Sequence, residues 1–536
     1  MNKPFFFFLA LICSLGLHAQ LQTGSDVAVT DTRAGKVRGY IADGVYTYKG
    51  IPYGRAARFE RARPVEGWED TRSSMTWGPV APLLTPTTSV VDEAEFVFDH
   101  DWGYTNEDCL VLNVWTPGIN DETKRPVLFW IHGGGFTAGS SQELPSYYGE
   151  NLSRKGDVVV VSVNHRLNVL GFLDLSGYGE RYATSANNGM VDLQLALEWV
   201  RDNIENFGGD PENVMIFGQS GGGAKVNTLM AMPEAKGLFH KAVNQSGAFR
   251  SDMLTKDVTQ RIGAAVVAEL GLDADGIDAI QSVPFDTLAA AGQRALATVA
   301  KELKDAGREV PGFGLGWGPS MDGAVLPYQT MSDEALALSA DVPLLIGTVK
   351  NEFMPSLRGG LSDATPEQID DYLTKQYGQK AADYRAAVKE AYPDDTKPSD
   401  VIDVDMMFRP GAVHQANVKS AVEGGAPVYM YLFTWQSPVL DGKYKALHCM
   451  EIPFVFDNIQ RANQMTGGGE EAQALADKMS QAWINFARNG DPNAEGLPTW
   501  EPYTADNGNT MMLDTESTVR QHPDRALLEF TRQSAR

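Results

Sequence analysis

Cysteine is scarce in this 536-residue chain, which has only Cys13, Cys109 and Cys449. Small exported domains that lack a sufficient core depend on dense disulfides, and so few cysteines exclude that class. Basic residues are also few, because 45 Lys and Arg stand against 69 Asp and Glu and give a formal net charge of −24. Such an acidic surface disfavours nucleic acid and anionic membranes as partners.

Long apolar stretches are missing beyond the N-terminus, where none reaches the roughly 18 uninterrupted apolar residues of a membrane-spanning helix. We therefore expect no membrane span. The N-terminus itself has the pattern of a signal peptide, with Lys3, an apolar run over 5–17, and then Leu-His-Ala at 17–19. We predict cleavage after residue 19, so that residues 20–536 form a mature protein that is secreted or periplasmic.

Short apolar, β-rich runs alternate with helical patterns along the mature chain. The clearest runs cover residues 126–131, 158–163, 213–218, 241–246, 342–347 and 427–433. Because these runs are continuously apolar, they predict strands buried on both faces of a large, mostly parallel central sheet. The regions near 251–340 and 355–420 have helical patterns instead, and we expect them to be helical cap insertions on a single α/β domain.

A serine lies between glycines where one of these runs ends. The sequence GQSGG, from Gly218 to Gly222, fits the pattern G-x-S-x-G and is followed by a helical stretch. This is the setting of a nucleophile elbow, a tight and strained turn that exposes a serine hydroxyl above a sheet. The alternative is a glycine-rich loop without chemistry. We predict that Ser220 is a nucleophile.

A second glycine-rich loop, WIHGGGF at 130–136, also ends a strand run. Acyl transfer places negative charge on a carbonyl oxygen, and preorganised backbone N–H groups stabilise that charge. The HGGG pattern is a known element of such oxyanion holes. We predict that Gly134, Gly135 and Gly221 donate to the oxyanion, the alternative being a flexible loop.

A serine nucleophile needs a base and an acid, which in this type of fold follow it in the order acid, then histidine. Of the eight histidines, only His414, His448 and His522 come late enough. His414 lies in a helical pattern and His522 in a polar stretch near the C-terminus, so we choose His448. Glu352, just past the strand run at 342–347, is the candidate acid, although chain order alone does not fix this choice.

Several longer segments resemble the type-B carboxylesterase family, which includes the cholinesterases, and suggest a bacterial exported member. The matching segments lie in family order at residues 107–117, 164–173, 199–223, 238–248 and 486–493. The resemblance implies an α/β-hydrolase fold, no cofactor or metal, and hydrolysis of small carboxylic esters through an acyl-enzyme. It implies the same triad of Ser220, Glu352 and His448, with Ser246 as a serine that supports the triad.

The chain departs from the family pattern at several positions. Many relatives have glutamate where Gln219 stands and alanine where Gly221 stands. Because Gln219 lacks the negative charge of that glutamate, a preference for cationic substrates is less expected here than in those relatives. Cys109 is often disulfide-bonded in relatives, but Ala81 stands where its partner would be, so we expect a free thiol. Cys449 has no family role that we can assign.

Two other classes of function fit parts of the pattern. One is another acyl hydrolase on the same scaffold, namely a lipase, a feruloyl- or tannin-type esterase, or an amidase. The other is a non-catalytic, cholinesterase-like binding module, which typically lacks triad members, whereas Ser220, Glu352 and His448 are all present here. We expect Gln219 and Phe136 to contact the substrate. The sequence makes no prediction about oligomeric state.

Overall fold

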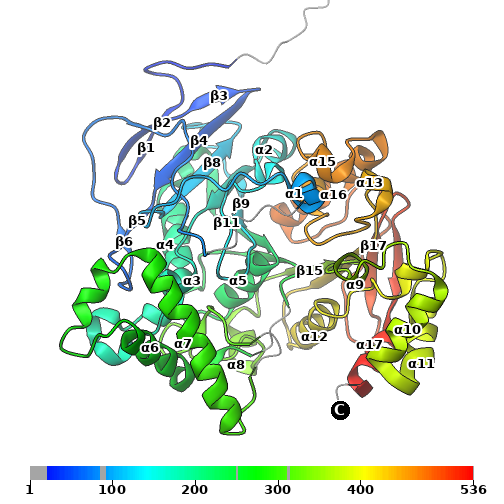
Figure 1. Cartoon of the computed structure of the whole chain (residues 1–536). Coiled ribbons are helices and arrows are strands. Elements are labelled where there is room, and N and C mark those ends of the chain that lie inside the picture. Colours follow the sequence, from blue (N-terminus) through cyan, green and yellow to red (C-terminus); the bar gives the residue numbers. More distant parts are fainter. Residues whose placement is uncertain (1–20, 85–91, 249–251, 311–313, 535–536) are drawn as a thin grey trace, which may run out of the picture.

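The computed structural model describes residues 21–84, 92–248, 252–310 and 314–534. The predicted signal peptide, residues 1–19, lies outside this part of the chain. A large sheet runs through the centre of the molecule, and helices lie along both of its faces (Figure 1).

The main sheet has eleven strands in the spatial order β18-β17-β16-β15-β12-β11-β9-β10-β8-β4-β3. In chain order they are β3 (Tyr40–Ala42), β4 (Val45–Pro52), β8 (Val111–Thr116), β9 (Arg125–Ile131), β10 (Val159–Val163), β11 (Gly209–Gln219), β12 (Lys241–Gln245), β15 (Leu344–Val349), β16 (Val428–Phe433), β17 (Asn509–Leu513) and β18 (Thr518–Gln521). The strands from β17 to β10 pair in parallel, whereas β18 and the strands β8, β4 and β3 pair antiparallel. The predicted α/β architecture is confirmed, and the antiparallel edges are an addition to it.

Each central strand contributes to two hydrophobic cores. In β9, Phe129 and Ile131 face one core, while Leu128 and Trp130 face the other. The first core includes α4 (Asn188–Asn203) and α5 (Gly221–Met230), and the second includes α2 (Glu150–Gly156) and α16 (Glu470–Asn489). Burial on both faces is the reason that these strands are continuously apolar.

The two regions without predicted strands are mainly helical. The first contains α6 (Lys256–Glu269), α7 (Phe285–Asp305) and α8 (Asp333–Leu338), together with the short pair β13 (Leu254–Thr255) and β14 (Ser320–Met321). The second contains α9 (Pro355–Gly359), α10 (Pro366–Tyr377), α11 (Ala381–Ala391) and α12 (Arg409–Ser420). Figure 1 shows α6 and α7 together at the lower left, below α3, and α10 and α11 together at the lower right, beside α17 (Arg525–Ser534).

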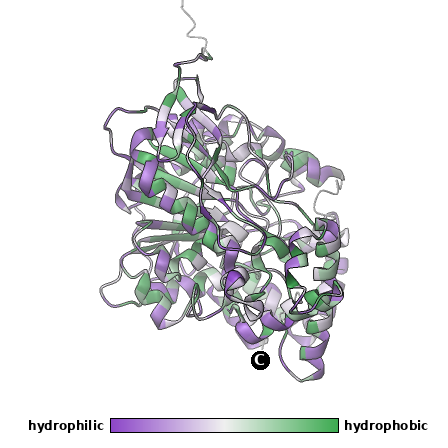
Figure 2. Cartoon of the chain, turned by 90° about the vertical axis from the view of Figure 1, so that its left-hand side faces the viewer, coloured by the Kyte–Doolittle hydropathy of each residue, from purple (hydrophilic) through white to green (hydrophobic). Residues whose placement is uncertain are grey.

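The described part of the chain also contains shorter strands and α-helices. The remaining strands are β1 (Val29–Thr32), β2 (Gly35–Arg38), β5 (Gly54–Arg55), β6 (Arg63–Pro64) and β7 (Arg72–Ser73). The remaining α-helices are α1 (Asp92–Phe98), α3 (Asn168–Phe172), α13 (Val439–Gly442), α14 (Ile452–Val455) and α15 (Asn463–Thr466). Figure 2 shows hydrophobic strands inside and hydrophilic residues on the outer helices. Of the helices described, none combines the length and apolar character needed to cross a bilayer.

The parallel strands bring distant parts of the sequence to one edge of the sheet. Because parallel strands share a direction, their carboxyl ends lie together, which is where open α/β sheets bind ligands. Strand β11 ends directly before Ser220, β9 ends before the loop at 132–136, and β15 ends three residues before Glu352. The parallel sheet alone therefore brings most of the predicted site residues to the same edge.

Candidate active site

Ser220 occupies a sharp turn between β11 and α5. Its backbone has φ 56° and ψ −122°, a conformation that residues with a side chain rarely adopt. Such a conformation costs about 1–3 kcal/mol and persists only where the surroundings enforce it. Here the Ser220 N–H donates to the carbonyl oxygen of Gln245 at 2.8 Å, which ties the turn to the neighbouring strand β12. The predicted elbow geometry is therefore present.

Glycines around the turn let another loop approach it closely. A Cβ atom at Gly221 would collide with the backbone of Gly135, and one at Gly222 would collide with the carbonyl oxygen of Ile131. The first turn of α5 thus lies directly against the end of β9 and the loop that follows it. The absence of side chains at Gly221 and Gly222 allows this approach in the present chain.

The three predicted oxyanion donors lie together at this contact. Gly134 and Gly135 have φ values of 79° and 63°, in the left-handed region that favours glycine. Among the hydrogen bonds of the described residues, none uses the N–H of Gly134, Gly135 or Gly221 as its donor. These groups are therefore available to an oxygen atom placed beside Ser220.

Glu352 and His448 form a close, buried pair. The Nδ1 atom of His448 lies in a short hydrogen bond to Oε2 of Glu352. The other carboxylate oxygen accepts the N–H of Val349 at 3.1 Å, and the His448 N–H donates to the Glu352 carbonyl at 3.1 Å. Since Nδ1 is occupied by the acid, Nε2 is the ring nitrogen left for a substrate or nucleophile.

Gln219 places the imidazole beside the elbow. Its side-chain nitrogen lies 3.4 Å from both ring nitrogens of His448, so the amide lies over the face of the ring. Gln219 directly precedes Ser220 in the chain. Within the described residues no hydrogen bond joins the Ser220 hydroxyl to the ring, as is common for catalytic contacts before a substrate binds.

Burial is the largest influence on the ionisation of both partners. It raises the pKa of Glu352 and lowers that of His448 to about 4. The carboxylates of Glu451 and Asp405 act in the opposite direction on His448 and raise its pKa. The contact between Glu352 and His448 likewise favours their charged forms. His448 is thus neutral at neutral pH, as a general base must be.

Ser246 lies next to the acid, as the resemblance implies. It follows β12 with a φ of 51°, and its N–H donates to Gly347 at 2.8 Å. The buried hydroxyl lies near enough to Glu352 to lower the pKa of that carboxyl, but outside hydrogen-bonding geometry.

A second buried glutamate near the site, Glu451, was not predicted from the sequence. Glu451 accepts the side-chain N–H of Gln245 at 3.2 Å, and burial raises its pKa to about 7. It lies three residues after His448, within the apolar segment HCMEIPFVF. A carboxylate in so apolar a run was the signal that could have identified it.

Other predicted residues have packing roles. Phe136 is 5% exposed, and its ring packs edge-to-face against the ring of Phe172, with centroids 5.4 Å apart. Its contacts are thus those of a core residue. Gln219 is completely buried and accepts the thiol hydrogen of Cys449 at 3.2 Å. Cys109 and Cys449 are both free thiols.

The rejected histidines lie apart from this cluster. His414 is an exposed residue of α12, and Nε2 of His522 is 3.0 Å from the carbonyl oxygen of Asp506. In the described ranges, no group of His, Cys, Asp and Glu is arranged to hold a metal ion.

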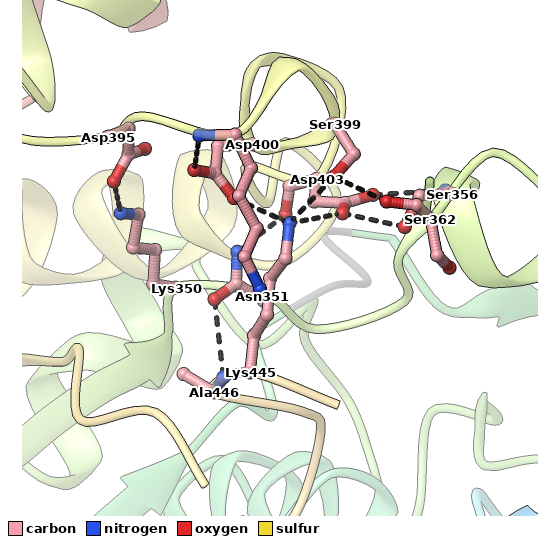
Figure 3. A network of polar contacts seen from close by, with 11 residues as sticks. Lys350, Asn351, Ser356, Ser362, Asp395, Ser399, Asp400, Asp403, Lys445 and Ala446 are labelled. Carbon is pink, nitrogen blue, oxygen red and sulfur yellow. Dashed lines mark hydrogen bonds and ion pairs between the residues drawn. The ribbon is translucent and has the colours of Figure 1, made fainter. Parts of the chain in front are cut away.

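A buried polar network joins the segments that carry the acid and the base (Figure 3). The Asn351 N–H donates to the carbonyl of Ala446 at 3.1 Å, and its side-chain oxygen accepts the Ala446 N–H at 3.3 Å. The side-chain nitrogen of Asn351 donates to the carbonyl of Asp403 at 3.1 Å. The residue before Glu352 is thus bonded to the segment that leads to His448.

Asp403 is the centre of this network. Its carboxylate accepts hydrogen bonds from Lys445 Nζ and Ser356 Oγ, each at 2.7 Å. Lys445 precedes His448 by three residues, and Ser356 follows Glu352 by four. Lys445 also pairs with Asp400 at 2.7 Å, and all these side chains are buried. One carboxylate therefore fixes the spacing between two segments that are far apart in sequence.

The sequence of this chain resembles those of known esterases and hydrolases over nearly its whole length. Residues 26–531 match the sequence model of the carboxylesterase family. Para-nitrobenzyl esterase of Bacillus subtilis is 34% identical over 92% of this chain and 96% of its own length. Phenmedipham hydrolase of Pseudarthrobacter oxydans is 33% identical over 91% of this chain and 95% of its own length.

Solved structures agree with these relatives. An esterase from anaerobic Clostridium hathewayi, described as able to hydrolyse aliphatic aromatic polyesters, superposes with a TM-score of 0.82 and 39% identity. The alignment covers 96% of this chain and 99% of that protein.

The acid limb of the pH profile should lie below the usual histidine range. Burial lowers the pKa of His448 to about 4, so the neutral base persists as the pH falls below about 6.5. We expect kcat/KM for an ester to remain near its maximum at pH 6 and to fall at lower pH. Recovery of full activity after return to neutral pH controls for acid unfolding. A midpoint at or above pH 6.5 would contradict the assignment.

Asp403→Asn should impair turnover more than substrate binding. Lys445 would lose one of its two carboxylate partners. The spacing between acid and base would loosen, which we expect to lower kcat by roughly 10-fold or more. Steady-state kinetics should show a KM changed by no more than about threefold. The matched control is Asp192→Asn, which breaks the buried Arg166 ion pair and should lower the melting temperature without lowering kcat. Equal losses of kcat in both variants would contradict a positioning role for Asp403.

Proposed function

Because the chain belongs to the carboxylesterase family and is a hydrolase of carboxylic esters, we propose that Ser220, His448 and Glu352 are its catalytic triad. The observation that carries this proposal is the strained Ser220 turn beside the buried His448–Glu352 pair. A nucleophile, a base and an orienting acid on separate segments, brought together by the sheet, have the geometry of acyl transfer.

The proposed reaction has two halves. Nε2 of His448 takes the hydroxyl proton as Oγ of Ser220 attacks the ester carbonyl carbon, and Glu352 stabilises the imidazolium. The carbonyl oxygen becomes an oxyanion that accepts hydrogen bonds from the N–H groups of Gly134, Gly135 and Gly221. The C–O bond breaks, His448 returns the proton to the leaving alcohol, and water then hydrolyses the acyl-enzyme by the same route.

We further propose that the preferred substrates are uncharged esters with an aromatic group. Names of relatives support this, since para-nitrobenzyl and phenmedipham hydrolases act on aromatic compounds. The ring of Phe353 lies 4.6 Å from the ring of His448 and is 39% exposed. It borders a cavity of about 490 Å³ whose wall includes Tyr372, Tyr377 and Tyr384. The side chain of Gln219 carries no charge that would attract a cationic alcohol.

We also propose that the protein is exported after removal of residues 1–19. The support is the charged, apolar and small-residue pattern of that segment in the sequence.

Ser220→Ala should abolish ester hydrolysis in a folded protein. Removal of the nucleophile from a triad of this kind lowers kcat by about 10⁶-fold. A panel of benzyl, phenyl, butyl and choline esters, assayed on the wild type and the variant together, also tests the substrate. We expect benzyl or phenyl esters to have a higher kcat/KM than butyl or choline esters. Wild-type turnover by Ser220→Ala would refute the triad, whereas preference for long acyl chains or amides would identify a lipase or an amidase.

Expression of the full chain in a bacterium should give a mature form that begins near residue 20. N-terminal sequencing of protein from the periplasm or the medium measures this directly. A variant with Leu9→Arg in the apolar run should remain unprocessed in the cytoplasm, because a charge disrupts the h-region. A processed form of that variant, or an intact N-terminus in exported wild type, would contradict the proposal.

A further inference from the structure

A completely buried lysine lies against the loop of the proposed oxyanion hole. Lys225 is in α5, five residues after Ser220, and has no exposed surface. Its Nζ atom donates to the carbonyl oxygen of His132 at 3.0 Å and lies 3.4 Å from that of Gly133. No ion pair among the described residues includes this lysine. A buried amine is costly, so its retention at this position calls for a reason.

The carbonyl groups that Lys225 contacts belong to the oxyanion loop itself. The Gly133 carbonyl and the Gly134 N–H are the two ends of one peptide group. Hydrogen bonding at the oxygen polarises the group and strengthens its N–H as a donor. Nδ1 of His132 also lies 3.0 Å from the Gly133 oxygen, so two side chains converge on this peptide.

We propose that Lys225 is a positioning residue that fixes and polarises the Gly133–Gly134 peptide for oxyanion binding. The proposal rests on the proposed function, since it requires the Gly134 N–H to act in the oxyanion hole. It adds a residue to that function, because Lys225 is not a member of the triad and contacts the loop through carbonyl oxygens.

The surroundings of Lys225 favour an effect on the loop. The rings of His132 and His165 stack with centroids 5.1 Å apart, and burial lowers the pKa of both well below the usual value, so neither carries charge. Nζ of Lys225 lies 5.9 Å from the centre of the Phe136 ring. Burial lowers the pKa of Lys225 to about 7, and the carboxylate of Glu143 opposes that change. The Nζ atom of Lys225 therefore lies close to the peptide that must face an anion.

The chain contains a matched lysine far from the triad in sequence and on another helix. Lys419, in α12, is also buried, and its Nζ donates to the carbonyl groups of Ser339 and Ala340. Neither carbonyl belongs to the oxyanion loop. If tying backbone together were the whole role of Lys225, loss of either lysine would have the same consequences.

The test compares Lys225→Met with Lys419→Met, which have matched side-chain changes. An aryl trifluoromethyl ketone adds to an active serine and forms a hemiketal whose oxyanion occupies the hole. We expect Lys225→Met to raise the inhibition constant of this ketone and to lower kcat/KM for a benzyl ester by the same factor, about 10-fold or more. KM should change by less than about threefold. Lys419→Met should lower the melting temperature and leave both kinetic values unchanged.

A second variant covers the case in which Lys225→Met does not fold. Lys225→Gln keeps an N–H donor without the charge, and its inhibition constant and kcat/KM should move together by a smaller factor. Folded variants whose two values stay within about threefold of wild type, or change independently, would overturn the role of Lys225. Absence of a hemiketal in the wild type, measured by fluorine NMR, would instead overturn the proposed function on which it rests.

Discussion

The contact between His448 and Glu352 is the interaction on which the rest of the site depends. It joins residues that are 96 positions apart and leaves a single ring nitrogen for the nucleophile. Two titratable groups of this kind cannot be buried without support, because burial disfavours the charged form of each. The fold supplies that support through the Val349 N–H on the acid and the Asp403 network behind both segments. These buried polar contacts therefore allow His448 and Glu352 to be buried together.

Close packing of backbone is the second constraint. Ser220 adopts a conformation that costs energy, and it can do so because Gly221 and Gly222 let α5 lie against the end of β9. The same approach places Gly135 beside Gly221. The close packing that holds the Ser220 turn therefore also brings the proposed oxyanion donors together. In this chain a Cβ atom at Gly221 would force the backbone of Gly135 to shift.

These constraints explain what could be predicted from the sequence. The six strand runs were identifiable because strands buried on both faces are continuously apolar, and Ser220 and the HGGG loop are local motifs at strand ends. The edge strands β3 and β18 are only partly buried and carry no such run. Asp403 and Lys445 were missed because their partnership depends on tertiary contact across 42 positions, which no local spacing reveals.

The buried acidic and basic groups around the site lie in different places: the acids lie near the imidazole, and a lysine lies near the oxyanion loop. Glu352 contacts the imidazole, and Glu451 and Asp405 raise its pKa, so all three acidic groups favour the positive form that arises when the ring takes the serine proton. The side-chain nitrogen of Lys225 contacts the carbonyl oxygens of the loop whose N–H groups are proposed to face the developing negative charge. Dipoles and charges fixed before reaction need no rearrangement as charge develops, which is the main source of catalytic power in such sites.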